Sequence, residues 1–370
     1  MKVTGIIVEY NPLHNGHIYH IEKSRELTQC DVLVAVMSGN FVQRGEPAII
    51  DKWQRCTAAL AHGVDLVIEL PFIYCNQSAK QFAQAAVDIL KLAQVDSIVF
   101  GSESNNIKEL QDIADMSINV DNLKEALKTG IGFPKAYGLM AGEYYPNDIL
   151  GIAYLKALKD STIKAYSIQR TTNYHDISFD QNVASARAIR SAVFADKDIN
   201  SYTPMVIDKT KAHNLSQYYP YIKTLLLTLD KPRLSSLFLF TEGIENHLIK
   251  QASEYEDFEH FINASVTKRY SRARIQRTLI SLLCQIRKQE VLDLPKLDTI
   301  RVLGFNQTGQ KYLKILKKND VKIATRFNQI PKPYRKMEYR SSIIYHAFDQ
   351  NFKADLKQEL NGPIIINSVK

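Results

Sequence analysis

Apolar and polar residues follow one another along the first hundred positions in a pattern that predicts alternating strands and helices. Between the strands, apolar residues recur at helical spacing over Ile18–Leu27 and Ser78–Gln94, and Asp51 is placed to cap a helix that continues to Ala61. Continuous apolar strands that alternate with helices are typical of a parallel sheet covered on both faces. We therefore predict an α/β, doubly wound, Rossmann-like domain. Its first four strands are expected at Val3–Val8, Val32–Met37, Val64–Leu70 and Ser97–Phe100.

The pattern changes further along the chain. A helix over Asn147–Leu158, a fifth strand over Lys164–Gln169 and a helix over Ser185–Phe194 complete a first domain, residues 1–200. Residues 201–295 are expected to form a helical domain, and residues 296–370 a small α/β C-terminal region. The helices of the second domain are expected at Tyr221–Leu229, Glu242–Ser253, Phe258–Ala264 and Arg272–Arg287. In the last region we expect strands at Thr299–Leu303 and Val321–Ala324 and a helix at Gly309–Lys318.

Composition narrows the class of protein. The 370 residues carry 47 basic and 39 acidic side chains, and the resulting net charge of +8 fits a polyanionic partner such as nucleic acid. No apolar run reaches the ~18 residues of a membrane span, and no secretory leader opens the chain. The four cysteines lack metal-binding spacing and are expected to be reduced thiols. These features predict a cytoplasmic protein without a membrane segment.

The segment that follows the first strand carries the most specific chemistry. It reads Glu-Tyr-Asn-Pro-Leu-His-Asn-Gly-His over residues 9–17, and it leads from a strand through a tight turn into a helix. The first N–H groups of a helix have no partner within it and favour an anion. His14 and His17 lie one turn apart there and can donate to phosphates, while Gly16 permits close backbone approach. Simple capping by two surface histidines is the alternative, but the strand–turn–helix setting favours a nucleotide site of the His-x-Gly-His kind found in the nucleotidylyl-transferase superfamily.

Further candidates follow other strands. In the loop and helix start after the second strand, Arg44, Lys52 and Arg55 can supply cations to a triphosphate, although each can equally be a solvated surface residue. Asn147 can cap the helix that it opens, and Arg170 follows the fifth strand. Ser185 opens the next helix and Arg190 lies one turn into it, a partial match to the Ile-Ser-Ser-Thr-x-Ile-Arg motif of the same superfamily; a capped helix with solvated arginines explains the pattern equally well.

A cationic run in the helical region suggests RNA. Five cations occur within ten residues and no acidic residue separates them, so they repel one another unless an anion binds. An aromatic residue among them can stack on a base. A solvated helix face is the alternative. The candidate RNA contacts are Lys268, Arg269, Tyr270, Arg272, Arg274 and Arg277.

Long motifs resemble one family, the tRNA(Met) cytidine acetate ligases. They are I-V-E-Y-N-P-L-H-N-G-H, M-S-G-N-F-V-Q-R-G-E-P-A, F-G-S-E, P-N-D-I-L-G and K-R-Y-S-R-A-R. The resemblance extends to about residue 310. It implies a bacterial, cytoplasmic enzyme that activates acetate with ATP as acetyl-adenylate and releases pyrophosphate. The acetyl group then passes to N4 of the wobble cytidine of elongator tRNA(Met), giving N4-acetylcytidine and AMP.

The resemblance also implies where ATP binds. Mg²⁺ is compatible with ATP chemistry, although no acidic cluster is dedicated to it, and no obligatory protein partner is evident. The Lys-Met-Ser-Lys-Ser loop of the wider superfamily is absent, so Arg170 and Arg190 are the candidates to neutralise departing pyrophosphate. The expected catalytic residues are His14 and His17. The expected ATP contacts are Ile7, Val8, Glu9, Tyr10, Asn11, Pro12, Leu13, His14, Asn15, Gly16, His17, Ile18, Tyr19, His20, Gly101, Asn147, Arg170, Ser185 and Arg190.

Two other functions fit parts of the pattern. A stand-alone adenylyltransferase that makes a nucleotide cofactor would share the His-x-Gly-His core, but it would not need the residues beyond the first domain or the cationic run. A non-catalytic RNA-binding protein with a decayed nucleotide fold would not need His14, Gly16 and His17 together. Acetate incorporation with ATP, with and without tRNA, separates the three functions.

Overall fold

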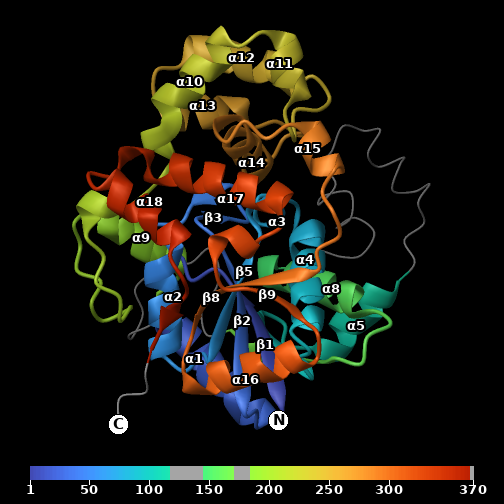
Figure 1. The fold of residues 1–370 in the computed structure, drawn as a ribbon. Coiled ribbons are helices and arrows are strands. Elements are labelled where there is room, and N and C mark those ends of the chain that lie inside the picture. The colour runs from blue at the N-terminus through green and yellow to red at the C-terminus, as the bar shows by residue number, and fades with distance from the viewer. Residues whose placement is uncertain (117–144, 171–183, 367–370) are drawn as a thin grey trace.

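The predicted strands assemble into one eight-stranded sheet in the computed structural model, which describes residues 1–116, 145–170 and 184–366 (Figure 1). The strand order is β10-β8-β5-β2-β1-β6-β7, and β9 also pairs with β8. Two short strands, β3 (Phe41–Val42) and β4 (Glu46–Pro47), form a separate antiparallel hairpin. The strands of the large sheet are β1 (Val3–Val8), β2 (Val32–Ser38), β5 (Leu66–Leu70), β6 (Ser97–Ser102), β7 (Lys164–Gln169), β8 (Thr299–Phe305), β9 (Lys322–Ala324) and β10 (Ile364–Ile365).

The first five of these strands are parallel, which confirms the doubly wound arrangement expected from the sequence. From β1 the chain adds β2 and β5 on one side and then crosses to add β6 and β7 on the other. The order therefore reverses between β1 and β6. In such sheets a crevice opens at the carboxyl ends of the strands next to the reversal, where ligands bind.

Helices cover both faces of the sheet. Along β2, Val32, Val34 and Val36 face one core, and the residues between them face the other, as the two-residue period of a strand requires. One face is covered by α1 (Asn15–Thr28), α2 (Lys52–Ala61) and α9 (Ala186–Phe194). The other is covered by α4 (Ala79–Leu92), α5 (Ile107–Asp115), α8 (Pro146–Leu158) and α16 (Gln307–Lys318).

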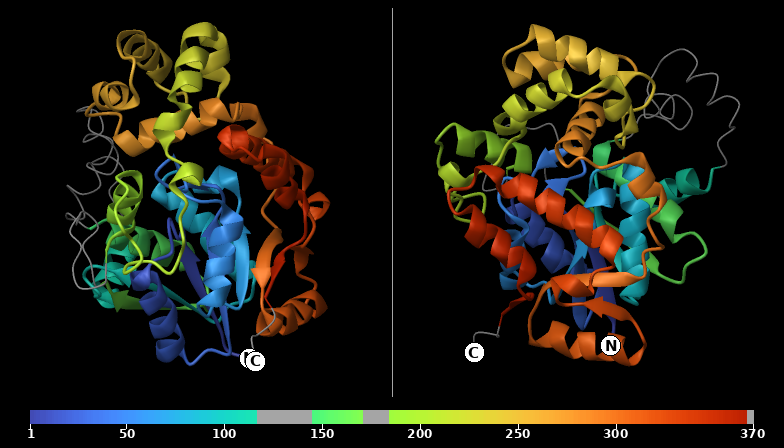
Figure 2. Two further views of the ribbon diagram at one scale, coloured as in Figure 1. Left: turned by 90° about the vertical axis from the view of Figure 1, so that its left-hand side faces the viewer. Right: turned by 45° about the horizontal axis from the view of Figure 1, so that its top comes forward.

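A helical layer lies beyond the carboxyl ends of the parallel strands (Figures 1 and 2). Its core contains Leu248, Phe261 and Leu279, and Phe41 of the hairpin and Phe72 of α3 (Phe72–Cys75) belong to the same cluster. The layer therefore packs directly on the end of the sheet. Its elements are η2 (Leu215–Tyr218), α10 (Tyr219–Thr228), α11 (Lys231–Ser236), α12 (Ile244–Glu254), α13 (Phe258–Ser265), α14 (Arg272–Leu283) and α15 (Lys288–Leu292), and η1 (Lys209–Lys211) precedes them in the chain.

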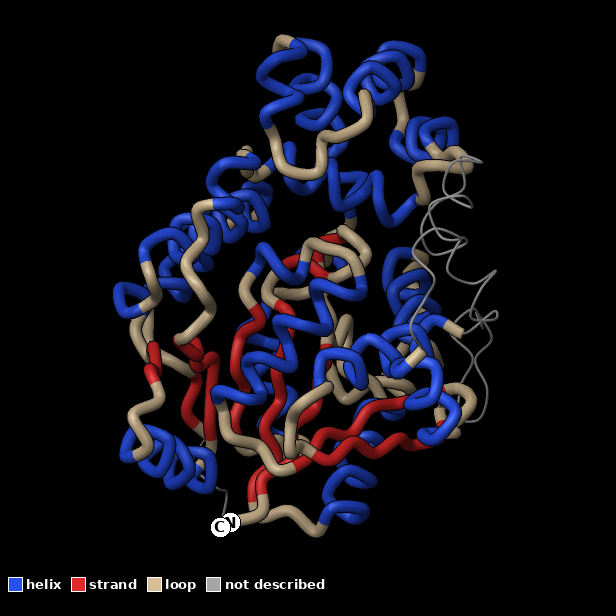
Figure 3. The backbone as a smooth tube through the Cα atoms, turned by 90° about the vertical axis from the view of Figure 1, so that its right-hand side faces the viewer, coloured by secondary structure: helices blue, strands red, loops and turns tan. Residues whose placement is uncertain are grey.

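The C-terminal residues return to the sheet. The expected strands and helix are present, but β8 pairs antiparallel with β5 and so extends the first sheet instead of starting another. Figure 3 shows the strands in red, seen from the right-hand side of Figure 1. The remaining elements are η3 (Phe327–Gln329), α17 (Lys332–Tyr345), η4 (His346–Phe348) and α18 (Phe352–Leu360).

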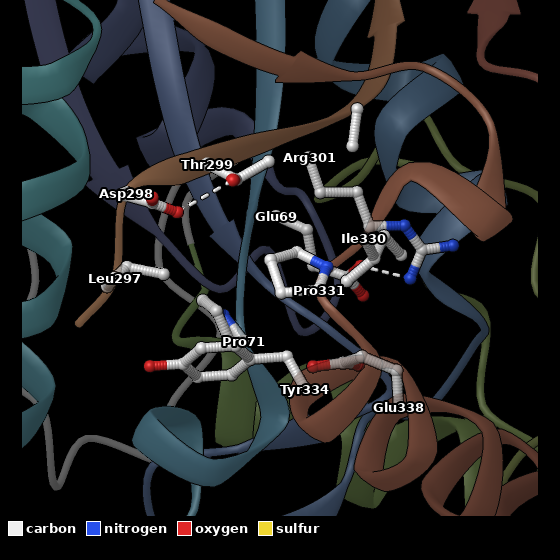
Figure 4. A pocket seen from close by; sticks show the side chains of 11 residues that line it. Glu69, Pro71, Leu297, Asp298, Thr299, Arg301, Ile330, Pro331, Tyr334 and Glu338 are labelled. Carbon is white, nitrogen blue, oxygen red and sulfur yellow. Dashed lines mark hydrogen bonds and ion pairs between the residues drawn. The ribbon is translucent and has the colours of Figure 1, made fainter. Parts of the chain in front are cut away.

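Buried charges fasten the returning segment to the sheet. Lys52 of α2 donates to Glu69 of β5 at 2.6 Å and to Glu359 of α18 at 2.9 Å. Arg301 of β8 pairs with both carboxylates. Figure 4 shows Glu69 and Arg301 beside Glu338 of α17, around a small cavity of about 20 Å³. Because a buried charge is costly when it loses its partner, this cluster binds four distant elements into one unit.

Two local predictions were wrong. Asn147 is not the N-cap of its helix, because α8 begins at Pro146 and Tyr145 is the capping residue. Proline favours the first turn of a helix, where its missing N–H has no partner to lose. Helix α14 ends at Leu283, short of the predicted Arg287, and Gln285 just beyond it has a φ of 49° that ends the helix.

Candidate active site

A cleft of about 590 Å³ opens at the carboxyl ends of β1 and β6, beneath the helical layer. Its walls come from β1, α1, the β3–β4 hairpin, β6, β7, α8 and α9, together with the start of α14. The sheet therefore brings together residues that are separated by more than 150 positions. The predicted ATP contacts that line it are Ile7, Val8, Glu9, Tyr10, Asn11, His14, Gly16, His17, Tyr19, His20, Gly101, Asn147, Arg170, Ser185 and Arg190.

Four residues of the predicted ATP stretch do not line the cleft. Pro12, Leu13, Asn15 and Ile18 are absent from its wall. Leu13 is fully buried in the core under α1, and the side chain of Asn15 donates to the carbonyl of Ser201 at 2.9 Å. These residues hold the turn in shape while their neighbours face the ligand space.

His14 and His17 form the start of α1 through their own side chains. His14 is the N-cap, and its Nδ1 accepts the N–H of Gly16 at 3.1 Å. The Nδ1 of His17 accepts the N–H of His14 at 3.3 Å, which completes a capping box made from imidazoles. The two rings are stacked with centroids 3.8 Å apart. Because both Nδ1 atoms accept, the proton of each neutral ring is on Nε2. The Nε2–H of His14 is left to donate to a phosphate, whereas the His17 ring also has a hydrogen bond to the backbone of Pro12.

Burial and neighbouring cations keep these imidazoles neutral in the protein. Burial, then Arg170 and Arg190, lowers the pKa of His14 to about 3. Burial, then the charge of His14, holds the pKa of His17 well below its usual range. Burial lowers the pKa of His20 to about 4. Phosphate charge raises the pKa of an imidazole, so the rings of His14 and His17 are suited to donate more strongly as negative charge develops nearby. The Nε2 of His20 is instead 3.2 Å from the carbonyl oxygen of Val99.

Arginines approach the cleft from three elements. Arg190 of α9 donates from Nη1 to the carbonyl of Asn11 at 2.8 Å, and its Nη2 is 3.7 Å from Glu46. Arg170 follows β7 and donates its N–H to the carbonyl of Ser102 at 3.0 Å. Arg44 of the hairpin also lines the wall. The cleft therefore presents guanidinium groups around the neutral histidines, an arrangement that suits a polyphosphate.

The other two cations suggested for the triphosphate do not face the cleft. Lys52 is buried in the Glu69–Glu359 ion cluster. Arg55 is fully buried and donates to main-chain carbonyls, with Glu9 at 2.6 Å, Ile50 at 3.1 Å and Ser38 at 3.2 Å among them. That guanidinium ties the loops after β1 and β2 together. The suggestion that these two residues contact nucleotide was wrong, because their partners are internal.

The loop after β6 positions one wall of the cleft. The carboxylate of Glu103 accepts the N–H groups of Asn147 and Asp148, each at 3.1 Å, and the Nδ2 of Asn147 at 2.6 Å. A Cβ added to Gly101 would lie 3.3 Å from the side chain of Arg170. Ser185 caps α9 by accepting the N–H of Ala188 at 3.1 Å, as its sequence position suggests. These contacts fix Asn147, Arg170 and the start of α9 around the ligand space.

The cationic run differs in part from its prediction. The ring of Tyr270 is buried and its hydroxyl donates to the carbonyl of Glu242 at 3.0 Å, so no ring face is open to a base in this conformation. Arg272 pairs with Glu259 at 2.9 Å. Lys268 and Arg269 are exposed. Arg274 donates to the Oγ1 of Thr241 at 2.7 Å.

Arg277 is the cation of this run that reaches the cleft wall. Its Nη1 donates to the carbonyl of Gln43 at 3.2 Å. Burial lowers the pKa of its guanidinium to about 10, with Arg274 and Arg44 acting in the same direction, and the group remains charged at neutral pH. The candidate RNA-binding run and the candidate nucleotide site therefore meet at the β3–β4 hairpin.

Outside the cleft, few side chains among the described residues form a group that could bind a ligand. One group of potential metal ligands, His346, Asp349 and Asp355, lies near the start of α18 and does not line the cleft. Among the helices in the described ranges, none combines the length and apolar character needed to cross a membrane.

Comparison with known proteins identifies relatives that match this chain over nearly its whole length. A model of the HIGH nucleotidyl transferase family matches residues 1–359. The tRNA(Met) cytidine acetate ligase of Oceanobacillus iheyensis is 38% identical over 400 residues, which cover 99% of this chain and 100% of that protein. The enzyme of the same name from a Thermoanaerobacter species is 40% identical over 89% of this chain and 90% of its own.

Solved structures give the same result. The crystal structure of apo Thermotoga maritima TmcAL is similar with a TM-score of 0.87 at 29% identity, and covers 100% of both chains. The structure of that protein bound with alpha-thio ATP is similar with a TM-score of 0.86 at the same identity and coverage.

Proposed function

Because the chain belongs to the HIGH nucleotidyl transferase family and, within it, to the tRNA(Met) cytidine acetate ligases, we propose that it acetylates N4 of the wobble cytidine of elongator tRNA(Met). Acetate is first activated by ATP as acetyl-adenylate, with release of pyrophosphate. The acetyl group then passes to the cytidine and AMP is released. The product is N4-acetylcytidine.

The observation that carries the proposal is the pair of stacked, neutral histidines at the start of α1. The pair lines a cleft that also holds Arg170 and Arg190. A helix start supplies unpaired N–H groups and a favourable dipole, and the imidazoles add Nε2–H donors. Such a site stabilises charge on phosphate oxygens, which is what displacement at the α-phosphorus of ATP requires.

In the first step the cleft holds acetate next to the α-phosphate of ATP, although both groups are anions. An acetate oxygen attacks the α-phosphorus, a new P–O bond forms, and the bond to the β-phosphate oxygen breaks. His14 and His17 donate to phosphate oxygens as charge builds, while Arg190 and Arg170 neutralise the departing pyrophosphate. Orientation and electrostatic stabilisation supply the rate, and no covalent enzyme intermediate is required. The cysteines are therefore assigned no role.

In the second step the cytidine approaches from the side of the helical layer. The exposed side chains of Lys268 and Arg269, with Arg274 and Arg277 further along, are proposed to hold the tRNA backbone. The cleft is bounded on that side by Ser271, Ala273 and Arg277. A base delivered along α14 therefore enters at the hairpin, opposite the start of α1.

Mg²⁺ is proposed to enter with the phosphates of ATP. The acidic side chains that line the described part of the cleft are Glu9 and Glu46, and Glu46 is near Arg190 and accepts from Gln276 at 3.1 Å. These residues do not make a dedicated cage. Mg²⁺ often binds through phosphates and water with few protein ligands, and the cleft fits that mode. When bound, the ion would neutralise charge on the leaving pyrophosphate.

The test uses labelled acetate with ATP, in the presence and absence of bacterial tRNA. The proposal predicts acetate-dependent pyrophosphate release without tRNA, and acid-stable label on elongator tRNA(Met) when tRNA is added. Label in a small dinucleotide or cofactor precursor would instead support a stand-alone adenylyltransferase. Binding of tRNA without either reaction would support a non-catalytic RNA-binding protein.

A further inference from the structure

Two acidic side chains in the described part of the cleft have the wrong charge for an anion site, and one of them, Glu46, contacts Arg190 and Gln276. Glu9 is the first residue after β1, and it lines the same cleft as His14, Arg44 and Arg190. A carboxylate there repels both the phosphates of ATP and acetate. A negative charge in this position needs a partner that is a hydrogen-bond donor or a cation.

The carboxyl group is held in place by the hairpin. Its Oε1 accepts the N–H of Gln43 at 2.7 Å, while the carbonyl of Glu9 accepts from Arg55 at 2.6 Å. One carboxyl oxygen is thus occupied by a main-chain donor and the backbone is clamped by a buried guanidinium. The second oxygen, Oε2, is the atom that Glu9 can present to a ligand.

Glu9 is also placed where the second substrate would arrive. The carbonyl of Gln43 accepts from Arg277 at 3.2 Å, and its N–H is bound to Glu9. A single residue of the hairpin therefore joins the carboxylate to the inner end of the cationic run. His14 and His17 line the same cleft from the start of α1. Through Gln43, Glu9 is connected to the helix along which the base is proposed to arrive.

The surroundings of the Glu9 carboxyl group raise its affinity for a proton. Burial raises the pKa of Glu9 above its usual range, against the opposing effects of the Gln43 N–H and of Arg44, Arg55 and Arg190. A base is most effective when its pKa lies closer to the working pH than that of an ordinary glutamate. The three arginines still favour an ionised state at the moment when the group must accept a proton.

We propose that Glu9 is a catalytic residue of the second step, and that its Oε2 accepts a hydrogen bond from the cytidine N4 amino group and then the proton that this group loses. This inference rests on the proposed function. The N4–C bond to the acetyl carbon forms, and the bond from that carbon to the phosphate oxygen of AMP breaks. The phosphate leaves as an anion, and the N4 proton moves to Glu9. A carboxylate is also the side chain that pairs with the cytosine amino group in nucleic-acid recognition.

The test separates the two steps with Glu9→Gln. The amide oxygen of glutamine can still accept the Gln43 N–H, so the hairpin keeps its anchor, but the side chain cannot take a proton. Enzyme is first loaded with ATP and labelled acetate and then mixed with tRNA in a single turnover. We expect acetyl transfer to slow by roughly 10²–10⁴-fold, and by at least about tenfold more than pyrophosphate release measured before mixing.

Glu22→Gln is the matched control, because it removes the same charge from the exposed face of α1. Its two rates should equal those of wild type. The pH profile is a second readout: the wild-type transfer rate should fall on the acid side as Glu9 becomes protonated, and Glu9→Gln should lose that dependence. Glu9→Asp, which keeps a base at shorter reach, should recover part of the rate.

Three results would overturn the inference. Equal losses in both steps would mean that Glu9 supports the fold of the cleft or holds Mg²⁺ for ATP. Normal transfer by Glu9→Gln would assign the proton to another acceptor, such as the departing phosphate. A transfer rate that is slow but keeps the wild-type pH profile would make Glu9 a binding residue only. If wild type itself forms adenylate and never labels tRNA, then the proposed function fails independently of Glu9.

Discussion

At the scale of single residues, His14 combines two roles in one ring. Nδ1 caps α1 through the N–H of Gly16, which leaves Nε2–H to face the cleft. Serine or asparagine at this position would also cap the helix, but its shorter side chain would not carry a donor as far into the cleft as Nε2 of His14 does. The strand–turn–helix pattern was sufficient to predict that His14 and His17 are adjacent, but it did not predict that each uses one ring nitrogen for the backbone.

Two substitutions of His14 should therefore separate stability from catalysis. His14→Ala removes both the cap and the donor and is expected to cost about 1 kcal/mol in the free energy of unfolding. His14→Asn can keep the cap, because its Oδ1 accepts the same N–H. Both variants should form acyl-adenylate at least ~10²-fold more slowly than wild type, because a donor to the transition state is lost.

Urea unfolding and acetate-dependent pyrophosphate release measure the two effects. The result that contradicts this assignment is an asparagine variant with normal turnover, which would limit His14 to its capping role.

The same residues illustrate how far sequence reasoning reaches. Glycine and histidine after one strand, and arginine after another, line the same cleft, as expected where strand ends converge on one edge of the sheet. Lys52 and Arg55 were placed wrongly because their partners cannot be read locally. Glu359, which neutralises Lys52, is 307 positions away. Charge alone does not show whether a cation faces a ligand or an internal anion.

At the scale of elements, the β3–β4 hairpin connects the sheet to the helical layer. A Cβ on Gly45 would lie 2.3 Å from the backbone nitrogen of Arg277, and Gly45 itself has a φ of +77°. Gln276 donates to Glu46 at 3.1 Å across the same contact. The sequence predicted only a loop between the second strand and the helix that follows it. The structure instead shows a turn pressed against α14, a contact that depends on residues 230 positions apart.

Gly45→Ala should loosen that contact. The left-handed backbone and the close approach to main chain both oppose a side chain, so we expect a loss of at least about 2 kcal/mol in the free energy of unfolding. Gly362→Ala is the control, since the nearest atom to its new Cβ would be 4.0 Å away. Chemical denaturation of both variants measures the difference. Equal stabilities would show that the hairpin and α14 do not need this close approach.

Helix α17 contributes a pH-dependent contact. Glu338 accepts the N–H of Phe72 at 2.6 Å, and burial, together with the charge of Glu69, raises its pKa to about 8. The folded protein then binds one more proton than the unfolded chain between about pH 4.5 and 8. The free energy of unfolding should therefore fall as pH rises through that window, by up to about 5 kcal/mol from this group.

Glu338→Gln tests this sign. Glutamine can accept the same N–H and does not ionise, so its stability should exceed that of wild type by a growing margin from pH 5 to pH 8. Parallel urea titrations at several pH values give the difference. A margin that stays constant with pH would mean that Glu338 is ionised in the folded protein.

At the scale of the whole molecule, the C-terminal region is part of the catalytic sheet. Periodicity correctly predicted strands after residue 296, but a strand pattern does not specify its neighbour, and β8 pairs antiparallel with β5. The same segment brings Arg301 and Glu359 into the buried ion cluster. The α/β character of the region could be read from the sequence, whereas its place in the fold depends on pairings across more than 200 residues.

Removal of residues 296–370 should therefore unfold the catalytic domain and not merely shorten the protein. The truncated chain would expose the edge of β5 and leave Lys52 and Glu69 with fewer partners in an apolar setting. We expect an aggregated product without adenylate activity. Solubility, circular dichroism and pyrophosphate release measure the outcome, and a soluble, active fragment would contradict it.

A point substitution gives a milder form of the same test. Arg301→Met leaves two buried carboxylates with one lysine between them, and should cost about 3–5 kcal/mol in the free energy of unfolding. The exposed pair Lys322–Asp298 serves as the comparison, because Lys322→Met there should change stability by less than about 1 kcal/mol.

The pairing of β5 with β8 also sets an order for assembly during synthesis. Glu69 leaves the ribosome 232 residues before its partner Arg301. At a translation rate of about 5–20 residues per second, roughly 10–50 s pass between the synthesis of β5 and the synthesis of the strand that covers its edge. During that interval the nascent chain presents an open, apolar strand edge to every neighbour, including its own later segments. We therefore expect the nascent chain to need a chaperone until its last seventy residues have been synthesised. The yield of folded protein in the cell should depend on the rate at which the residues after β5 are translated.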